Sequence, residues 1–389
     1  MLMKLLVFTT LYPNAAQPHH GLFVEKRLLE LIRRYPCDVR VVAPVPWFPR
    51  WLGGGRYAAF ARVPRRETRS GVEISHPRYL VVPKLTWRFA PLMLVLGALR
   101  TVRGLRRQGF AFDLIDAHFV FPDGVAAQML GGLCGVPVCI TARGSDINDS
   151  PRYWLPRRMI RWAMSRAKTL IAVSGELAAK IRALTDTPPV VHVLPNGVDR
   201  GRFFPRPEAA LRERLGAAGP IVLSVGNLRE LKGHDILIRA VATLPGVSLI
   251  IIGTGEEETN LNRLITQLGV ADRVRLLGAV DNAELPAYYN AADVFALASS
   301  SEGCPNVVLE AIACGTPVVA TAVGAIPELV PSSCLRLLVQ GRTPTAFAEA
   351  LRTCLDDPPA AAELHARAET FGWDTTCERL RTILVDSAA

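Results

Sequence analysis

This sequence of 389 residues lacks cysteines in Cys-x-x-Cys spacing, although it contains eight cysteines. They stand singly, at Cys37, Cys134, Cys139, Cys304, Cys314, Cys334, Cys354 and Cys377. The lack of a Cys-x-x-Cys spacing argues against a zinc site or a dithiol redox motif. Several of these cysteines fall in segments predicted to be helices or strands, as buried, reduced thiols do. We therefore expect a cytoplasmic protein.

Long apolar runs are also absent. The stretch from Phe89 to Leu99 is too short to cross a bilayer, because a span needs about 20 residues. The first apolar run ends near Phe8 without a cleavage site, so we expect a buried first strand and no signal peptide. The sequence shows neither a fixed-period repeat nor a low-complexity segment. With 50% apolar residues, the chain can form two domains of ordinary size.

Acidic residues are scarce in the first half of the chain only. Residues 1–200 have a formal charge balance of +16, and residues 201–389 have one of −6, which together give the net charge of +10. A basic half and a mildly acidic half indicate a different partner for each.

Short apolar runs alternate with longer amphipathic ones, which is typical of a parallel sheet with crossover helices. A turn cluster, Pro195-Asn196-Gly197-Val198-Asp199, followed by Arg202 to Pro207, separates two such series, and we place the linker there. The fold class is therefore α/β, with two doubly wound domains in tandem. The predicted strands are Lys4–Phe8, Val39–Ala43, Leu114–Asp116, Pro137–Thr141, Thr169–Val173 and Val190–Leu194, then Ile221–Val225, Ser248–Ile252, Val274–Leu276, Val294–Ala298 and Pro317–Thr321.

Two carboxylates, Glu302 and Glu310, flank the start of a predicted helix, with seven residues between them. Pro305 suits a first helical turn. The amides of Cys304, Asn306 and Val307 would point out of the helix start, where oxygen-rich ligands bind. A ligand with a polyol at one end and a ribose at the other could meet both carboxylates. The simpler alternative is that Glu302 caps the helix and Glu310 is a solvated helix residue.

This stretch continues through Gly315-Thr316-Pro317 to Gly324-Ala325-Ile326-Pro327-Glu328. The whole resembles the nucleotide-sugar signature of the family 4 retaining glycosyltransferases, which have the GT-B fold of two Rossmann-like domains facing across a cleft. The resemblance implies that Glu302 binds the donor sugar, that Glu310 binds the ribose, and that the amides of Gly303 to Asn306 orient the sugar. It implies an acceptor domain at 1–198, joined by a C-terminal helix at 371–389, and a nucleotide-sugar domain at 199–370.

Lys232 follows a predicted strand and opens a helix. A cation disfavours a helix start but is well placed to hold phosphate; a solvated lysine is the alternative. The family usually has an arginine directly after Gly226, where this chain has Asn227, and Arg229 is a candidate replacement. Lys232 matches the family motif and is the predicted phosphate cation.

Gly253 and Gly255 follow the next strand but lack the third glycine of a dinucleotide loop, since Glu258 stands there. The resemblance implies that these glycines let the backbone approach a nucleobase, and a plain turn is the alternative. Gly21 precedes a helix and would let its loop approach a diphosphate, or it forms a helix-start turn without a ligand.

His118 follows a strand of the first half and resembles the active-site histidine of the family, which contacts the donor sugar; a packed or surface histidine is the alternative. Arg143 and Asp146 follow the next strand, and Arg143 stands where many relatives have histidine. These two residues could hold a donor diphosphate or an acceptor, or they could pair with each other.

Basic and aromatic residues interleave in the first half, as expected at the surface of an anionic bilayer. No nucleic-acid module accompanies them, and solvated arginine-rich helices are the alternative. We expect peripheral association with the inner face of a membrane and an acceptor such as a polyprenol-diphosphate glycan. The stretches are Pro49-Arg50-Trp51, Arg56-Tyr57, Trp87-Arg88-Phe89, Arg100 to Arg107 and Arg152 to Trp162.

The predicted function is transfer of a sugar, with retention, from a UDP- or GDP-sugar to a glycan or lipid-linked acceptor in polysaccharide or glycolipid biosynthesis. No Asp-x-Asp stands in a metal-binding context, and the resemblance implies no metal requirement and no other cofactor. No residue is a convincing covalent nucleophile, which favours displacement on the same face. Two rivals are a sugar-nucleotide epimerase, with His118 as its one clear acid or base, and an inactive nucleotide-sugar or membrane-binding module, which Asn227 favours.

Overall fold

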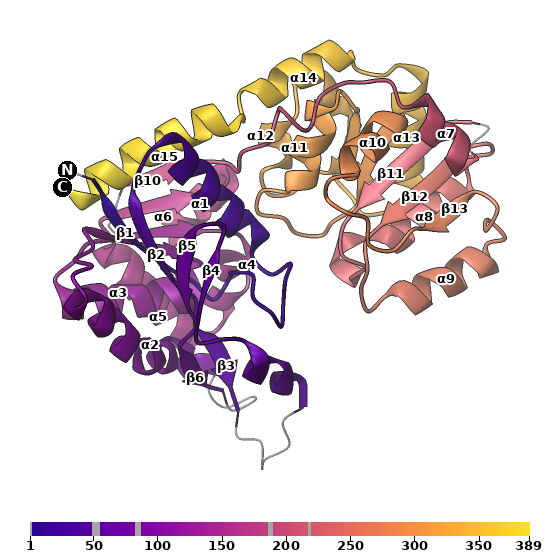
Figure 1. Cartoon of the computed structure of the whole chain (residues 1–389). Coiled ribbons are helices and arrows are strands. Elements are labelled where there is room, and N and C mark those ends of the chain that lie inside the picture. Colours follow the sequence, from indigo (N-terminus) through magenta and orange to yellow (C-terminus); the bar gives the residue numbers. More distant parts are fainter. Residues whose placement is uncertain (1, 49–54, 82–86, 186–189, 217–218) are drawn as a thin grey trace. The chain divides into compact units, whose positions relative to one another are not determined.

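The computed structural model describes residues 2–48, 55–81, 87–185, 190–216 and 219–389; the side chains of residues 55–58 lie outside the description. The chain divides into two compact units (Figure 1). Unit 1 comprises Met1–Asn196 and Thr376–Ala389, and unit 2 comprises Gly197–Thr375. Among the described helices, none has the length and apolar content needed to cross a membrane. None of the eight cysteines forms a disulfide.

Unit 1 is a parallel sheet with one antiparallel edge. Its strands lie in the order β10-β9-β8-β7-β1-β2-β5-β4, and only β4 and β5 pair antiparallel. Because the order reverses between β1 and β7, the chain segments that follow these two strands meet at one edge. The six strands predicted in this half are confirmed, as β1 (Lys4–Phe8), β2 (Asp38–Val42), β7 (Leu114–His118), β8 (Val138–Ala142), β9 (Thr169–Ala172) and β10 (Val191–Val193).

Four short strands of unit 1 were not predicted: β3 (Val45–Trp47), β6 (Arg78–Leu80), β4 (Arg66–Arg69) and β5 (Val72–Ser75). The pair β3 and β6 forms a small separate sheet, and β4 and β5 extend the edge of the large one. Charged and half-exposed side chains dominate β4 and β6, while β3 and β5 are interrupted by Pro46 and Glu73, so none has the apolar run that marks a central parallel strand.

The helices of unit 1 follow its strands at amphipathic stretches. Ser174 starts one of them by accepting a hydrogen bond from the Leu177 N–H at 3.1 Å, as a good N-cap does. The helices are α1 (Leu22–Arg34), α2 (Ala90–Arg107), α3 (Val125–Cys134), α4 (Ser145–Asn148), α5 (Trp154–Arg166) and α6 (Gly175–Leu184).

Unit 2 contains a fully parallel sheet in the order β13-β12-β11-β14-β15-β16. Here the order reverses between β11 and β14, which is the doubly wound arrangement. Five predicted strands are confirmed, and the two-residue β16 was not predicted. The strands are β11 (Ile221–Val225), β12 (Ser248–Ile252), β13 (Val274–Leu276), β14 (Val294–Leu297), β15 (Val318–Thr321) and β16 (Leu338–Val339).

The core of unit 2 consists of buried aliphatic and aromatic side chains of this sheet, such as Leu223, Ile250 and Phe295, and of the apolar faces of its helices. The helices are α7 (Ala209–Leu215), α8 (His234–Ala242), α9 (Glu258–Gln267), α10 (Leu285–Ala291), α11 (Asn306–Ala313), α12 (Ile326–Leu329), α13 (Pro344–Asp356) and α14 (Ala361–Glu369).

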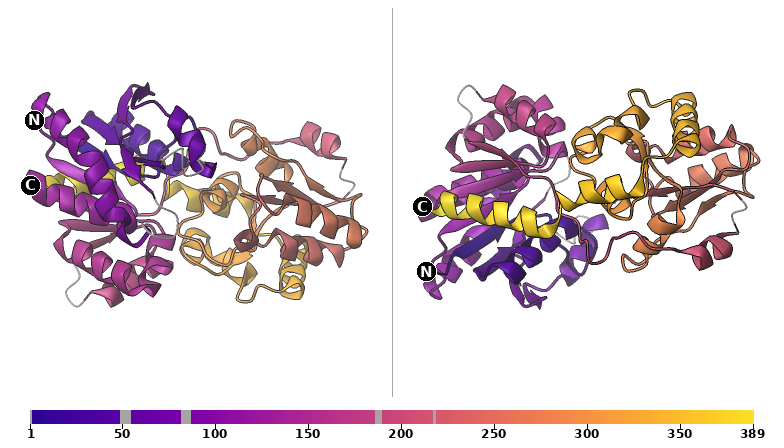
Figure 2. Two further views of the ribbon diagram at one scale, coloured as in Figure 1. Left: turned by 90° about the horizontal axis from the view of Figure 1, so that it is seen from below. Right: turned by 90° about the horizontal axis from the view of Figure 1, so that it is seen from above.

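The last helix, α15 (Trp373–Ala388), begins in unit 2, and from Thr376 it belongs to unit 1. Arg379 donates to the Val193 carbonyl at 2.8 Å, and the Ser387 hydroxyl donates to the Thr169 hydroxyl at 2.8 Å. Figure 2 shows this helix, in yellow, lying along unit 1 in the view from above. These contacts attach the end of the chain to the sheet of unit 1.

Candidate active site

Two loops of unit 2 meet where its strand order reverses. One follows β11 and includes Asn227 to Gly233, and the other follows β14 and includes Ala298 to Pro305. Because β11 pairs with β14 in parallel, both loops leave the sheet at its carboxyl edge. Ligands of doubly wound sheets bind at this edge, beside the point of reversal.

Lys232 and Glu302 connect these two loops directly. The Lys232 Nζ donates to the Glu302 Oε1 at 2.6 Å, and the side chains are 20% and 11% exposed. Neither simpler alternative fits: the lysine is paired rather than solvated, and no side chain caps helix α11. A cation and a carboxylate that face each other at an accessible edge can exchange their contact for an anionic and a hydroxyl group of one ligand.

The two loops are held by further hydrogen bonds. The N–H of Ser300 donates to the Leu231 carbonyl at 2.8 Å, and the N–H of Ala325 donates to the Gly303 carbonyl at 2.9 Å. The Arg342 guanidinium donates to the carbonyls of Ala298, at 2.9 Å, and Glu230, at 3.3 Å, and so joins both loops. Sequence reasoning missed Arg342, because its position after β16 carries no motif.

Glu310 lies within α11 and is buried. The hydroxyl of Tyr289, from α10, donates to the Glu310 Oε2 at 2.9 Å. Burial and the neighbouring carboxylate raise the pKa of Tyr289 well above its ordinary value, so the hydroxyl keeps its proton and remains a donor. The alternative of a solvated Glu310 is therefore wrong. Tyr289 was not predicted, since nothing in the sequence connects it with Glu310.

The start of α11 differs by one residue from the prediction. Pro305 is extended, with φ −74° and ψ 113°, and stands before the first helical residue, Asn306. The amides of Asn306 and Val307 therefore lie in the first turn, and Gly303 and Cys304 belong to the preceding loop.

Gly253 and Gly255 have a structural reason to be glycine. Gly253 has φ +143°, and a Cβ there would lie 2.0 Å from the Gly226 carbonyl oxygen. At Gly255 a Cβ would lie 2.3 Å from the Leu228 carbonyl oxygen. These contacts join the loop after β12 to the loop after β11. The required close approach is thus between two backbone segments, and an approach to a nucleobase stays a prediction.

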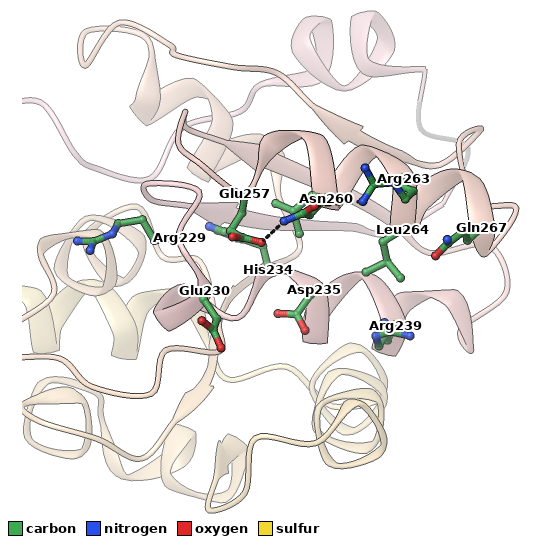
Figure 3. A pocket seen from close by; sticks show the side chains of 11 residues that line it. Arg229, Glu230, His234, Asp235, Arg239, Glu257, Asn260, Arg263, Leu264 and Gln267 are labelled. Atoms are coloured by element: carbon green, nitrogen blue, oxygen red, sulfur yellow. Dashed lines mark hydrogen bonds between the residues drawn. The ribbon is translucent and has the colours of Figure 1, made fainter. Parts of the chain in front are cut away.

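Arg229 is 58% exposed, and its Nε lies 3.7 Å from the Glu256 carboxylate. Figure 3 shows it at the margin of a hollow of about 490 Å³ that α8 and α9 border. Whether Arg229 replaces the family arginine missing at Asn227 stays a prediction.

His118 in unit 1 is the last residue of β7 and is 2% exposed. The guanidinium of Arg143 donates to its Nδ1 at 3.0 Å, so the proton resides on Nε2, which lies 3.3 Å from Asp116. Burial lowers the pKa of His118 to about 4, so the ring is neutral near pH 7. The described packing engages both ring nitrogens within the protein, and a contact with donor sugar stays a prediction.

Asp116 is buried beneath His118 and pairs with Arg27 of α1 at 3.2 Å. Burial raises the pKa of this carboxyl, but Arg27, His118 and Arg143 together outweigh burial and bring the pKa to about 2. Arg27 also donates to the Thr141 hydroxyl at 2.9 Å. Neither Asp116 nor Arg27 was a predicted site residue; an aspartate two residues before His118 was the available signal.

The side chains of Arg143 and Asp146 have separate partners. Besides His118, the Arg143 guanidinium donates to Asn196 at 2.8 Å and lies 5.0 Å from the centroid of the Phe23 ring. The buried Asp146 carboxylate accepts the main-chain N–H groups of Val120, at 2.8 Å, Arg143, at 3.1 Å, and Gly144, at 2.8 Å. Asp146 thereby fixes the loops after β7 and β8.

The loop after β1 is fixed by Asp123, which accepts hydrogen bonds from the N–H and, at 3.1 Å, the hydroxyl of Thr10. Burial raises the pKa of Asp123 to about 7. Gly21 closes the same loop with φ +72°, and a Cβ there would lie 2.3 Å from the Leu11 carbonyl. Its glycine is required by this turn, and its role toward a diphosphate stays a prediction.

Among the described residues, no group of three His, Cys, Asp or Glu side chains is arranged to hold a metal ion. Independence from metal stays a prediction. The predicted basic stretches at residues 49–51 and at the side chains of Arg56 and Tyr57 lie outside the described residues.

Comparison with known proteins agrees with the sequence resemblance. Residues 208–371 match the family model "Glycosyl transferases group 1", and residues 54–202 match "Glycosyltransferase Family 4". The chain is 31% identical over 358 residues to the teichuronic acid biosynthesis glycosyltransferase TuaC of Bacillus subtilis (strain 168), covering 90% of this chain and 88% of that protein. It is 33% identical over 312 residues to the D-inositol 3-phosphate glycosyltransferase of Salinispora arenicola (strain CNS-205), covering 72% and 69%.

Among solved structures, the sucrose-phosphate synthase of Thermosynechococcus elongatus is similar in fold, with a TM-score of 0.79 and 20% identity over 98% of both chains. Anabaena HepE, in complex with UDP and glucose, has a TM-score of 0.75 and 23% identity over 98% of this chain and 99% of its own. The two parallel sheets, the two family models and the identity to TuaC together show that this chain belongs to the family 4 glycosyltransferases and is a transferase enzyme with the GT-B type of fold.

Proposed function

We propose that this enzyme is a retaining glycosyltransferase that moves a sugar from a nucleoside-diphosphate donor to a glycan or lipid-linked acceptor. The observation that carries the proposal is the ion pair between Lys232 and Glu302 at the reversal point of the unit 2 sheet, at 2.6 Å. It brings together a cation for the diphosphate and a carboxylate for the sugar hydroxyls of such a donor.

The pair exchanges partners when the donor binds. Lys232 moves its contact to the diphosphate, and Glu302, released from the lysine, accepts hydrogen bonds from hydroxyls of the sugar. The amides of Asn306 and Val307 add partial positive charge at the start of α11. As the bond between the anomeric carbon and the diphosphate oxygen breaks, Lys232 stabilises the negative charge of the leaving group.

Retention follows from attack on the face that the diphosphate leaves. The acceptor hydroxyl forms the new bond to the anomeric carbon, and its proton passes to an oxygen of the departing diphosphate. No covalent enzyme intermediate and no metal are needed, since the charge is stabilised by side chains and amides. We assign ribose binding to Glu310, whose position is fixed by the hydrogen bond from Tyr289.

The donor class that we favour is a UDP-sugar, with GDP-sugars as the alternative. HepE, which has a similar fold, was solved with UDP and with UDP-glucose. For the acceptor we favour a polyprenol-diphosphate-linked glycan presented at the inner face of an anionic membrane, with the enzyme peripheral to it. The basic composition of residues 1–200 supports this assignment, and TuaC is named for teichuronic acid biosynthesis.

The test is a donor hydrolysis assay in the presence of EDTA. UDP-, GDP- and ADP-sugars are incubated with the enzyme, and release of nucleoside diphosphate and the anomeric configuration of the freed sugar are measured by NMR. We expect slow release from one donor, with retained configuration at first appearance, and a loss of at least about a hundredfold in Glu302→Gln.

Lys180 and Glu176 provide a matched control, because they form an exposed Lys–Glu ion pair within α6. Glu176→Gln should leave turnover unchanged. Undiminished turnover in Glu302→Gln would reject the site assignment, inversion would reject the retaining mechanism, and a new sugar-nucleotide isomer would identify an epimerase.

A further inference from the structure

One helix layer of unit 1 contains no acidic residue. Helix α3 packs against both α2 and α5, and Figure 1 shows the three together in the lower part of unit 1. Helices α2 and α5 contribute four arginines each, and none of the three contains Asp, Glu or Lys. A solvated helix surface normally mixes charges of both signs. The exposed side chains of these three helices are called the arginine face below.

The arginines of this face point into solvent over both α2 and α5. Arg100 and Arg103 of α2 are exposed, as are Arg157 and Arg158 of α5. A hollow of about 500 Å³ at the start of α5 is lined by Trp154, Arg157, Arg158 and Arg161. Convergent guanidinium groups of this kind match a layer of phosphate groups.

Large apolar side chains are exposed on the same face. Trp154 is 71% exposed, Leu96 is 61% exposed, and Leu133 of α3 is 59% exposed. Leu92, one turn before Leu96 on α2, is exposed as well. Aliphatic side chains gain little from a bare phosphate or a nucleic acid, but they gain from the acyl boundary of a bilayer.

Acidic residues that lie near these helices in sequence already have partners, and Asp123, two residues before α3, accepts hydrogen bonds from Thr10. Asp149 lies 3.6 Å from Arg152, and Asp113 accepts the main-chain N–H of Lys4 at 2.8 Å. By contrast, α1 and α15, which approach each other where Arg381 lies 5.2 Å from the Tyr35 ring, both carry acidic residues. The complete absence of acidic residues thus distinguishes this helix layer from helices α1, α4, α6 and α15 of the same unit.

We propose that the arginine face binds the surface of a bilayer that contains anionic phospholipids. The guanidinium groups contact lipid phosphates, and Leu92, Leu96, Leu133 and Trp154 enter the interface between headgroups and acyl chains. This docking surface does not depend on the assignment of the donor site, because all of its residues lie in unit 1 and outside the catalytic machinery proposed above.

The face also leads toward the candidate site of unit 1. The Trp87 ring contacts Tyr153, with centroids 4.7 Å apart, and Phe121, with centroids 6.2 Å apart. Phe121 lies in the turn that follows His118 and precedes Asp123. Docking through the arginine face therefore places the carboxyl edge of β7 and β8 beside the headgroup layer, where the diphosphate of a lipid-linked acceptor resides.

The experiment is sedimentation of the full-length enzyme with vesicles of phosphatidylcholine, with and without about a third phosphatidylglycerol. We expect binding to the anionic vesicles only, weakening as salt rises from about 0.1 M to 0.5 M. Arg157→Glu/Arg158→Glu should lower the partition coefficient roughly a hundredfold. Leu96→Ala/Trp154→Ala should lower it about tenfold, with a loss that salt does not alter.

Arg33→Glu/Arg214→Glu is the matched control, because it makes the same change of charge at exposed arginines of α1 and α7. Circular dichroism verifies that each variant is folded, and Arg157→Gln/Arg158→Gln replaces the reversal variant if it is not. Hydrogen exchange on the wild-type enzyme gives a second measurement, with protection by anionic vesicles expected at residues 87–107 and 153–166 but not at 22–34. Glu302→Gln should bind vesicles like the wild type, which separates this test from that of catalysis.

Three outcomes would overturn the proposal. One is failure of the wild-type enzyme to bind anionic vesicles, and another is equal loss of binding in the control and in the arginine-face variants. The third is binding that inorganic diphosphate or an RNA oligomer abolishes without any exchange protection over α2, which would indicate a site for phosphate or nucleic acid alone.

Discussion

The two sheets of this enzyme reverse their strand order in the same way, but they use the edge beside the reversal differently. In unit 2 the edge has an ion pair, Lys232 with Glu302, that solvent can reach. In unit 1 the corresponding edge has several polar groups that are almost fully buried, including Asp116, His118 and Asp146. One edge has groups that a ligand can take over, and the other has groups that position the loops.

This difference indicates whether a polar residue at a strand end contributes to the stability of the fold or to the binding of a ligand. Removing one partner of a buried ion pair leaves a charge without compensation, and this destabilises the fold. Water reaches the Lys232–Glu302 pair, whose side chains are 20% and 11% exposed, and compensates in part for the loss of either partner. We therefore expect variants in unit 1 to act on stability and variants in unit 2 to act on catalysis.

The largest expected effect is on stability, from Arg27→Met in unit 1. The buried Asp116 carboxylate loses its closest cation, so the free energy of unfolding should fall by about 3 to 5 kcal/mol. Urea denaturation measures it. Arg33→Met, on the same helix and in an exposed pair with Glu30, is the control and should change stability by less than about 0.5 kcal/mol. If the free energy of unfolding fell by the same small amount in both variants, the polar groups at the unit 1 edge would not be the stabilising groups that we describe.

The next effect is on catalysis, from Lys232→Ala in unit 2. Loss of the cation at the leaving diphosphate should lower kcat/KM by about a thousandfold, or ~4 kcal/mol, while the free energy of unfolding should fall by less than in Arg27→Met, because water still reaches Glu302. Steady-state kinetics and urea denaturation are measured on the same preparation. Lys180→Ala, from the exposed pair of α6, should alter neither. A fall in the free energy of unfolding as large as the fall in activity would show that the ion pair is structural.

The pH dependence of stability should change in Asp123→Asn. The pKa of Asp123 is raised by burial to about 7, so between about pH 4 and 7 the folded protein binds a proton that the unfolded chain has lost. This group makes stability fall as pH rises, whereas the neutral, buried His118, with a pKa of about 4, makes it rise over pH 4 to 6.5. Without Asp123, stability should rise more steeply, by up to about 1.4 kcal/mol per pH unit. Denaturation at several pH values measures the slope, and an unchanged slope would contradict the raised pKa.

The smallest effect is expected from Arg342→Gln, which loosens the two loops without removing a group that touches the donor. The KM for the donor should rise about tenfold, which is about 1.4 kcal/mol, with kcat reduced less than threefold. Arg336→Gln is the control, since Arg336 pairs with Asp357 at 2.7 Å in the adjacent segment. A decrease confined to kcat would place Arg342 at the reacting groups instead of the loops.

The central strands could be predicted from sequence because each is a short, fully buried apolar run, such as Ile221–Val225. The edge strands could not, because Arg66–Arg69 is held by pairing with Val72–Ser75 and not by its own apolar content. In the site, Lys232 and Glu302 were predicted from a family motif, but their direct contact depends on the order of β11 and β14, which the sequence does not state.

The partners of the predicted residues were the hardest to foresee. Tyr289 and Arg27 lie on helices, where they read as an ordinary buried aromatic and an ordinary charged residue. Their contacts with Glu310 and Asp116 arise only when distant segments pack. Asp123 lies in the sequence stretch after His118 that was singled out, but the loop around Thr10 buries it. This burial, which raises its pKa, is not visible in the sequence.

In the proposed donor site, the contact between Gly253 and the Gly226 carbonyl limits how the donor preference of this enzyme can diversify. The loops after β11 and β12 touch through their backbones with no room for a side chain, so a longer or shorter loop would separate them. Variation compatible with the fold is therefore confined to side chains that project from a constant frame, such as those of Asn227 and Arg229. A mutant library for new donors would retain more folded members if it varied those two positions and kept every loop length.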